Sequence, residues 1–218
     1  MKLATAVYLI VGLINLYAQF IGDQTINQFT KPVLMPVLIY LIFLKAKGFV
    51  NLPRLLLALA LIFAWIGDML LLNQSDEMFF LGGLGSFLVM QVLYCVVFYK
   101  AMNSSQQPKP ALWSPFLVFF IVVSCLAYLH AGAMWLPITI YAITILSMLV
   151  FAVNRKDQTD VISFRLALLG AALFVISDSL IGLNKFIVEI PQASFLIMLT
   201  YIPAQYLIMA GVMKYDNN

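Results

Sequence analysis

Charged side chains are scarce in this sequence, and histidine and cysteine are scarcer still. Charged residues make up only 10% of the 218 residues, whereas hydrophobic residues make up 64%. Soluble domains typically contain about 25% charged and about 45–50% apolar residues. The mean hydropathy of +1.02 points the same way. This excess of apolar surface needs lipid as its solvent, so the sequence predicts an integral membrane protein.

The shortage of metal-ligating residues excludes several kinds of site. The single histidine, His130, cannot supply the ligands of a histidine-rich zinc hydrolase. Cys95 and Cys125 lie inside apolar runs, which predicts small buried side chains rather than a disulfide or a metal site. The net charge of +3 is small and dispersed. We therefore expect no metal site and no nucleic-acid partner.

Eight apolar runs have the length of a membrane-spanning helix, which needs about 20 residues with a range near 17–25. The second run opens at Lys31-Pro32, because proline suits the first turn of a helix. The first run is long for the core of a signal peptide and lacks a small-x-small cleavage site, so we expect a retained helix. The sequence predicts one all-α domain over residues 1–218, a bundle of eight transmembrane helices at 3–21, 32–46, 54–73, 79–99, 111–129, 133–153, 163–183 and 191–213.

Basic residues set the expected orientation, because loops rich in lysine and arginine stay in the cytoplasm. With eight spans, one side of the membrane holds only Lys31 and Lys185. The other side holds Lys2, Lys45, Lys47, Arg54, Lys100, Lys109, Arg155, Lys156, Arg165 and Lys214. Both termini are therefore expected in the cytoplasm, and the expected location is the inner (plasma) membrane of a bacterium.

A weaker pattern hints at internal duplication. Asp68 and Asp178 lie about half the chain apart, and similar tripeptides precede them, Trp-Ile-Gly and Val-Ile-Ser. If the halves 1–102 and 111–218 are repeats, they contain four spans each and have the same orientation, as in transporters built from parallel repeats.

Two aspartates interrupt apolar runs. An aspartate at the centre of a spanning helix costs about 2.5–3.5 kcal/mol on insertion scales, so such residues are usually functional or paired inside the bundle. Asp68 and Asp178 each lie about five residues from the expected outer end of a span, a depth of about 7–8 Å. We expect them to share a pocket; alternatively, each only ties neighbouring helices together. The other acidic residues lie in expected loops and tails, namely Asp23, Asp76, Glu77, Asp157, Asp160, Glu189 and Asp216.

Further polar side chains in the spans are candidates for binding water or a headgroup. Gln91 and Tyr94 lie in the fourth span, Tyr201 and Gln205 in the eighth, and Lys31 at the outer end of the second. Together they are expected to line a polar cavity that opens outward, with Lys31 near a phosphate. Individually, such residues are more often interhelical hydrogen-bonding groups or interfacial anchors.

Two carboxyl groups in one buried site can act as an acid and a base. Glycosidases use this arrangement to pass through an oxocarbenium-like transition state. A vinyl ether can be cleaved in a related way, because protonation of its alkene carbon gives an oxocarbenium ion that water attacks. That chemistry needs no metal or organic cofactor. The same groups also suit a proton-coupled transporter, and a purely structural membrane subunit is a third alternative.

Several short motifs occur in a characteristic order and spacing over nearly the whole chain. They are Lys31-Pro32, Gly67-Asp68 followed by three leucines at 70–72, residues 83–87 with Tyr94, residues 169–174 with Ser177-Asp178, and Tyr201 with Gln205. In these motifs the chain resembles the YhhN, or lysoplasmalogenase-like, family of polytopic membrane proteins.

The resemblance implies eight helices and hydrolysis of the vinyl ether bond of lysoplasmalogens, with release of a fatty aldehyde and a glycerophospho-alcohol. It places Asp68 and Asp178 at the two acidic positions of the family. The family pattern usually has a histidine where this chain has Gln91, so histidine-dependent chemistry is not expected here. The favoured function is thus a membrane hydrolase acting on a single-chain ether lipid; the alternative is a proton-coupled transporter or a lipid-handling protein without hydrolysis.

Overall fold

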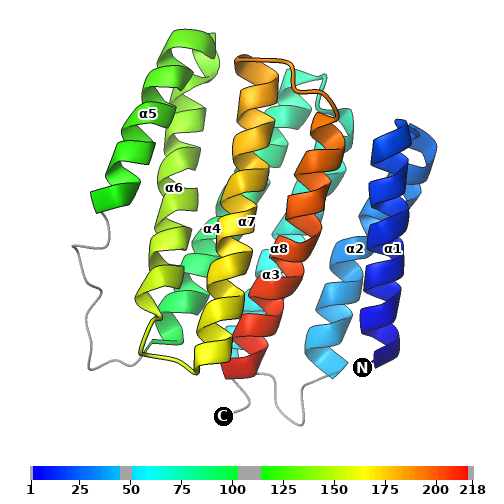
Figure 1. The fold of residues 1–218 in the computed structure, drawn as a ribbon, viewed down its shortest axis with the longest axis vertical. Helices are drawn as coiled ribbons and strands as arrows, with labels where there is room; N and C mark the ends of the chain where they lie inside the picture. The colour runs from blue at the N-terminus through cyan, green and yellow to red at the C-terminus, as the bar shows by residue number, and fades with distance from the viewer. Residues whose placement is uncertain (1, 45–50, 103–113, 216–218) are drawn as a thin grey trace.

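A computed structural model describes residues 2–44, 51–102 and 114–215. These residues form eight α-helices that run alongside one another, which confirms the all-α prediction (Figure 1). The helices are α1 (Lys2–Ile21), α2 (Gln24–Leu44), α3 (Leu52–Leu70), α4 (Glu77–Lys100), α5 (Ser114–His130), α6 (Trp135–Asn154), α7 (Val161–Phe186) and α8 (Ala193–Tyr215). Short 3-10 turns, η1 (Leu71–Asn73) and η3 (Gly132–Met134), extend α3 and precede α6.

Seven of the eight helices are long and apolar enough to cross a membrane. The exception is α5, which has 17 residues and an apolar stretch at Phe116–His130. The predicted fifth span, 111–129, begins in residues outside the described ones. The structure therefore supports a helical membrane protein with seven long candidate spans and a shorter apolar helix.

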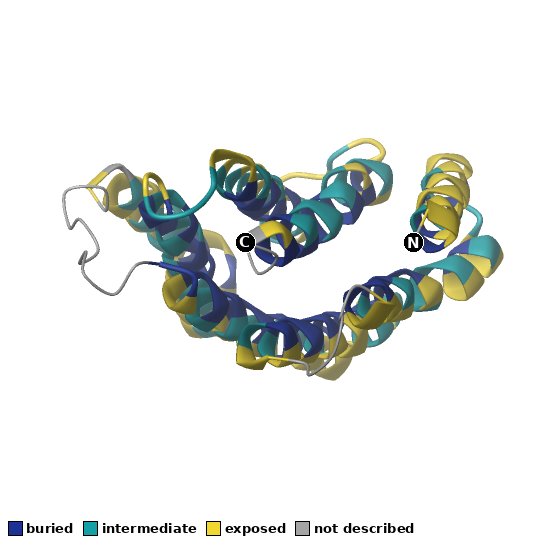
Figure 2. Ribbon diagram, turned by 90° about the horizontal axis from the view of Figure 1, so that it is seen from below, coloured by how far each residue is buried: buried dark blue, intermediate teal, exposed yellow. Residues whose placement is uncertain are grey.

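The helices form two curved layers (Figure 2). One row consists of α2, α3, α4 and α6, each in contact with the next, and α7 and α8 pack on its concave side. The row is closed at one end by α1, which contacts α2 and α8, while α5 packs against α6 at the other end. The first helix begins and the last helix ends at the same end of the bundle (Figure 1).

The second helix begins at Gln24, eight residues before the predicted start at residue 32, so the prediction that it opens at Lys31-Pro32 was wrong. Asp23 caps the true start, because its Oδ1 accepts from the backbone N–H groups of the next turn. The first two turns of α2 are polar, and side chains of α1 supply hydrogen-bond partners for them. Asn15 Nδ2 donates to Asn27 Oδ1 at 3.1 Å and to Thr30 Oγ1 at 2.8 Å. Hydropathy misses such a segment because its polar groups are paired inside the bundle.

Two prolines lie inside α2, and the second one changes how α2 meets α3. Pro36 has no N–H, so the carbonyl oxygen of Pro32 loses its usual intrahelical donor. Trp65 Nε1 of α3 donates to that oxygen instead, at 2.9 Å. This bond fixes α3 against α2 beside Lys31 and Asp68. The last two residues of the predicted second span, 45 and 46, lie outside the described part of the chain.

The cysteines are both free, but they are not both buried as predicted. Cys95 is half-buried and Cys125 is exposed on α5. The prediction was wrong for Cys125 because an apolar run in a membrane helix does not reveal which face points to lipid. A lipid-facing position is as apolar as a core position.

Candidate active site

Asp68 lies near the end of α3 and is held by side chains from two other helices. Its side chain is only 2% exposed. Lys31 Nζ of α2 lies 3.6 Å from Oδ1, and the Tyr201 hydroxyl of α8 donates to Oδ2 at 2.8 Å. Three residues predicted for the site therefore meet in space. An ion pair this deeply buried is costly to break, because loss of one partner leaves the other charge uncompensated.

Asp178 lies on α7 and faces a partly open cavity of about 230 Å³ lined mainly by residues of α4, α5, α6 and α7. The lining is almost entirely aliphatic and aromatic, and its polar side chains are those of Asp178, Tyr141 and Ser179. The hydroxyl of Tyr141 on α6 donates a short hydrogen bond to Asp178 Oδ2. No basic side chain of the described residues forms an ion pair with Asp178. The arrangement is a single carboxyl group, held by a phenol, on the wall of an apolar cavity.

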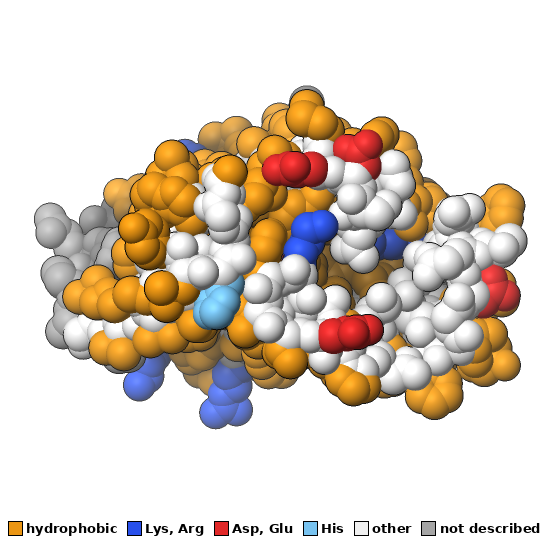
Figure 3. Space-filling view, turned by 90° about the horizontal axis from the view of Figure 1, so that it is seen from above, with side chains coloured by type: hydrophobic (Ala, Val, Ile, Leu, Met, Phe, Trp, Pro, Cys, Tyr) orange, Lys and Arg blue, Asp and Glu red, His pale blue; other side chains and the backbone are white. Residues whose placement is uncertain are grey.

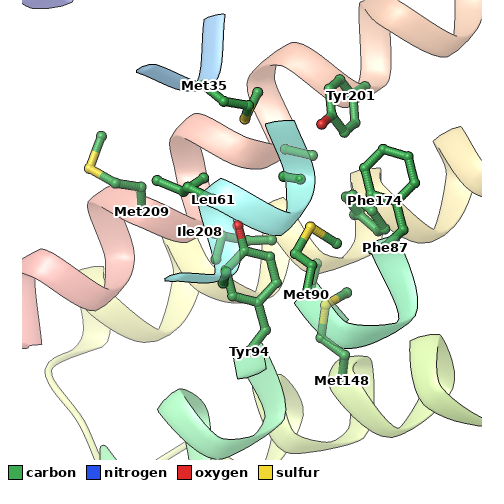
Figure 4. Close-up of a cluster of buried hydrophobic side chains, with 14 of the residues drawn as sticks. Met35, Leu61, Phe87, Met90, Tyr94, Met148, Phe174, Tyr201, Ile208 and Met209 are labelled. Carbon is green, nitrogen blue, oxygen red and sulfur yellow. The ribbon is translucent and has the colours of Figure 1, made fainter. Parts of the chain in front are cut away.

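Three aromatic rings, which we call the aromatic partition, pack against one another in the core, namely those of Phe87, Phe174 and Tyr201 (Figure 4). Phe87 lines the cavity, and its ring centroid lies 6.2 Å from that of Phe174 and 6.0 Å from that of Tyr201. Phe87 also packs against Gly67, where an added Cβ would lie 3.0 Å from the ring. In the described structure, Asp68 is not part of the cavity wall.

The two aspartates nevertheless belong to one electrostatic neighbourhood. The two carboxyl groups lie near enough for the charge of Asp68 to act on Asp178. Around Asp68 itself, the closer groups Lys31 and Tyr201 dominate. The sequence predicted a common pocket for the two acids. In the structure Asp178 reaches the cavity and Asp68 does not, and the contact of Phe87 with Tyr201 connects the cavity wall to the partner of Asp68.

Three of the predicted binding residues lie away from the cavity, in the core between helices. Gln91, Tyr94 and Gln205 are fully buried, and the cavity lining does not include them. The Tyr94 hydroxyl donates to Gln205 Oε1 at 2.5 Å, which joins α4 to α8. Thr144 Oγ1 donates to Gln91 Oε1 at 2.6 Å, and Gln91 also interacts with the Tyr141 hydroxyl. The expectation that these side chains line an outward-opening polar cavity was wrong, because Tyr94 and Gln205 bond to each other and Gln91 bonds to Thr144 across helix contacts.

Two residues of the site were missed from the sequence. Tyr141 was hidden because tyrosine is common in membrane spans, although it lies at a depth comparable with that of Asp178. Lys185 was recognised only as one of two basic residues on the expected outer side. Its Nζ donates to the Gln74 carbonyl oxygen at 2.9 Å and lies 4.4 Å from the ring centroid of Phe80, a residue of the cavity wall. Figure 3 shows the corresponding end of the bundle, where basic side chains lie within a hollow.

Comparison with known proteins decides the family. The profile of the YhhN family matches residues 26–212, which is most of the chain. The chain belongs to the YhhN family. All the site residues described above, from Lys31 to Gln205, lie within the matched region.

A curated relative of this YhhN-family chain is named lysoplasmalogenase TMEM86A, from Bos taurus. The two are 30% identical over 161 residues, which cover 71% of this chain and 63% of the relative. The match thus spans a little under two thirds of the relative's length. No solved structure gives a significant match to the chain.

Proposed function

We propose that the protein is a membrane-embedded hydrolase that cleaves the vinyl ether bond of a lysoplasmalogen-like single-chain lipid. The observation that carries this proposal is the position of Asp178, a carboxyl group on the wall of an otherwise apolar cavity and next to a second buried carboxyl. A hydrocarbon chain matches the lining, and the reacting bond of a vinyl ether lies at the junction of that chain with a polar backbone. The likeness to a lysoplasmalogenase supports the same chemistry.

The surroundings of the two acids suggest different roles for them. Asp178 reaches the cavity and is held by Tyr141, so we assign it the proton transfer to the substrate. Asp68 is paired with Lys31, which balances a negative charge on its carboxylate. In this proposal the negative charge of the Asp68 carboxylate stabilises, through its electric field, the positive charge that develops in the cavity.

The proposed reaction follows the chemistry of vinyl ethers. Asp178 donates its proton to the alkene carbon distant from the ether oxygen, and the remaining carbon becomes an oxocarbenium ion. A water molecule adds to that carbon, and its proton returns to Asp178, which leaves a hemiacetal. The hemiacetal then collapses to a fatty aldehyde and a glycerophospho-alcohol. General acid catalysis of this kind contributes about 10²–10⁴-fold.

The other polar residues would act through the two acids. Lys31 and Tyr201 orient Asp68, and Gln91 supports Tyr141. The Tyr94–Gln205 bond holds α4 and α8 at the spacing that the aromatic partition needs. Lys31 was expected to meet the substrate phosphate, but its position beside Asp68 gives it a different role in this proposal.

The proposal is tested with purified protein in detergent, incubated with lysoplasmenyl-ethanolamine or lysoplasmenyl-choline and followed by mass spectrometry. Wild type is expected to release fatty aldehyde, while Asp178→Asn and Asp68→Asn fold normally and lose at least about 10²-fold in rate. Undiminished aldehyde release by both variants would contradict the acid/base assignment. No aldehyde from well-folded wild type with either headgroup would contradict the proposed function.

A proton-coupled transporter is the second candidate, and the buried Lys31–Asp68 pair favours it, since paired charges within membranes often belong to proton pathways. Reconstituted protein distinguishes the two functions. Lipid movement that follows an imposed pH gradient, with no aldehyde formed, supports transport. Aldehyde formed without a gradient supports hydrolysis.

A further inference from the structure

Lys185 is held at the outer rim of the apolar cavity. It lies one residue before Phe186, which lines the cavity, and its ammonium group rests over Phe80, which also lines it. Phe80 and Phe186 pack edge to face, with centroids 6.0 Å apart. The ammonium group has three N–H donors, and one of them donates a hydrogen bond to the Gln74 carbonyl oxygen. Within the described structure these contacts fix the cation at the cavity mouth, and no carboxylate forms an ion pair with it.

The distribution of basic residues makes this position unusual. Among the described residues, Lys31 and Lys185 are the two lysine or arginine residues toward the end of the bundle opposite the termini, the side where the sequence predicts few basic residues. Lys31 is accounted for by its ion pair with Asp68. Lys185 has no such carboxylate partner among the described residues.

Lys185 and Asp178 also have a defined relationship along α7. They are seven residues apart, which is two helical turns, so they lie on the same face of the helix. The rise between them is about 10.5 Å. A glycerophosphate backbone is shorter than this rise, but the long flexible side chain of Lys185 adds reach, so a phosphate bound by Lys185 can place the chain linkage of a single-chain phospholipid toward Asp178.

We propose that Lys185 binds the phosphate of a single-chain phospholipid whose hydrocarbon chain occupies the cavity between α4, α5, α6 and α7. The inference rests on the proposed function and adds to it the residue that selects a phosphate-bearing lipid. With the phosphate at Lys185, the chain linkage lies beside Asp178 and Tyr141. The alternative role of Lys185 is that of an interfacial anchor with no ligand.

Binding, rather than turnover, tests the proposal. The probe is a fluorescent lysophosphatidylcholine, displaced by unlabelled lysophosphatidylcholine or by the monoacylglycerol of equal chain length. Neither competitor contains a vinyl ether, so neither depends on the hydrolytic step. Wild type is expected to bind the phospholipid more tightly than the monoacylglycerol. Inorganic phosphate at equal concentration is expected not to displace the probe, which separates a headgroup site from a free-phosphate site.

Lys185→Gln is expected to weaken lysophosphatidylcholine binding roughly fivefold, the effect of one partly exposed charge pair. It should leave monoacylglycerol binding unchanged, and Lys185→Arg should restore the preference for phosphate. Lys214→Gln, at the opposite end of the bundle, is the matched control and should bind like wild type.

Two results would overturn the inference: equal weakening of both ligands by Lys185→Gln, or no change in either. These outcomes are independent of the hydrolysis assay. Absence of aldehyde with an intact phosphate preference would contradict the hydrolase and leave the phosphate site standing. Aldehyde release without a preference for the phosphate-bearing lipid would support the hydrolase and contradict the phosphate site.

Discussion

The indole of Trp65 donates its hydrogen bond to the one carbonyl oxygen of α2 that Pro36 deprives of its helical donor, that of Pro32. A proline that weakens α2 thereby creates an acceptor, and the neighbouring helix uses it. The bond lies one residue from Lys31 and three residues from Asp68 along their helices. It fixes the register of α2 against α3 at the point where the buried ion pair forms.

Trp65→Phe is expected to lower the free energy of unfolding by about 1–3 kcal/mol, because the Pro32 oxygen, which lacks a donor within α2, then also loses the indole donor. Thermal unfolding in detergent measures the loss. Trp135→Phe is the matched control, since Trp135 at the start of α6 is exposed to a similar degree but lies away from the Pro32 oxygen on α2. An equal loss in both variants would show that the effect comes from ring size rather than from the hydrogen bond.

A double-mutant cycle measures how far the stability contributed by the Trp65–Pro32 hydrogen bond depends on Pro36. Pro36→Ala supplies an N–H that can bond to the Pro32 oxygen within α2. In that background, Trp65→Phe should cost less stability than it costs in wild type. Equal costs in the two backgrounds would mean that the indole bond does not compensate for the proline.

Filling the cavity should block the substrate without unfolding the protein. Gly182 lines the cavity between Asp178 and Lys185, and an added Cβ there would meet no atom within 4 Å. Gly182→Leu is therefore expected to abolish lysophosphatidylcholine binding and aldehyde release while the melting temperature is retained. Gly85→Leu is the control, because Gly85 has equal free space but lies outside the cavity. Normal binding by the Gly182 variant would argue that the chain binds elsewhere.

A substitution at Gly67 on α3 can displace the aromatic partition. In Gly67→Ala the new Cβ would lie 3.0 Å from the Phe87 ring, so the ring must shift toward the cavity. Overpacking costs about 1–3 kcal/mol, against a gain of about 1 kcal/mol in helix propensity. Gly85→Ala should show only the gain in helix propensity, because an added Cβ there meets no atom within 4 Å. We expect a lower melting temperature and a raised KM for Gly67→Ala, and a melting temperature at or above that of wild type for Gly85→Ala.

Tyr141 is expected to matter for turnover more than for binding. Tyr141→Phe removes the hydroxyl that holds Asp178 and keeps the ring, so kcat should fall roughly ten- to hundredfold with little change in lipid affinity. Tyr128→Phe on the exposed face of α5 should behave like wild type. A raised KM with unchanged kcat for Tyr141→Phe would assign the hydroxyl to substrate binding instead.

Hydropathy alone predicts most of the helices here, and it fails where polar groups pair with one another. Most predicted spans agree with the structure to within a few residues, because lipid imposes a uniform length on apolar runs. The polar start of α2 was missed because its partner Asn15 lies on α1, and no single segment reveals that pairing. The internal repeat and the orientation in the membrane stay predictions.

The site was predictable to the extent that a residue is out of place in its own segment. Asp68 and Asp178 interrupt apolar runs, and Lys31 and Lys185 violate the charge distribution. Tyr141 has no such signature, since its importance comes from a contact between α6 and α7. The aromatic partition was equally hidden, because phenylalanine at position 87 is ordinary until its ring is seen to line the cavity and to pack against Tyr201, the partner of Asp68.

The most direct test of the central claim is to run the hydrolysis in D₂O with lysoplasmenyl-ethanolamine and to locate the deuterium in the product by mass spectrometry. Protonation of the alkene carbon by Asp178 predicts a fatty aldehyde with one deuterium on the carbon next to the carbonyl group, formed by wild type and not by Asp178→Asn. Aldehyde without deuterium at that carbon, or labelled aldehyde formed equally well by the Asp178→Asn variant, would contradict the account.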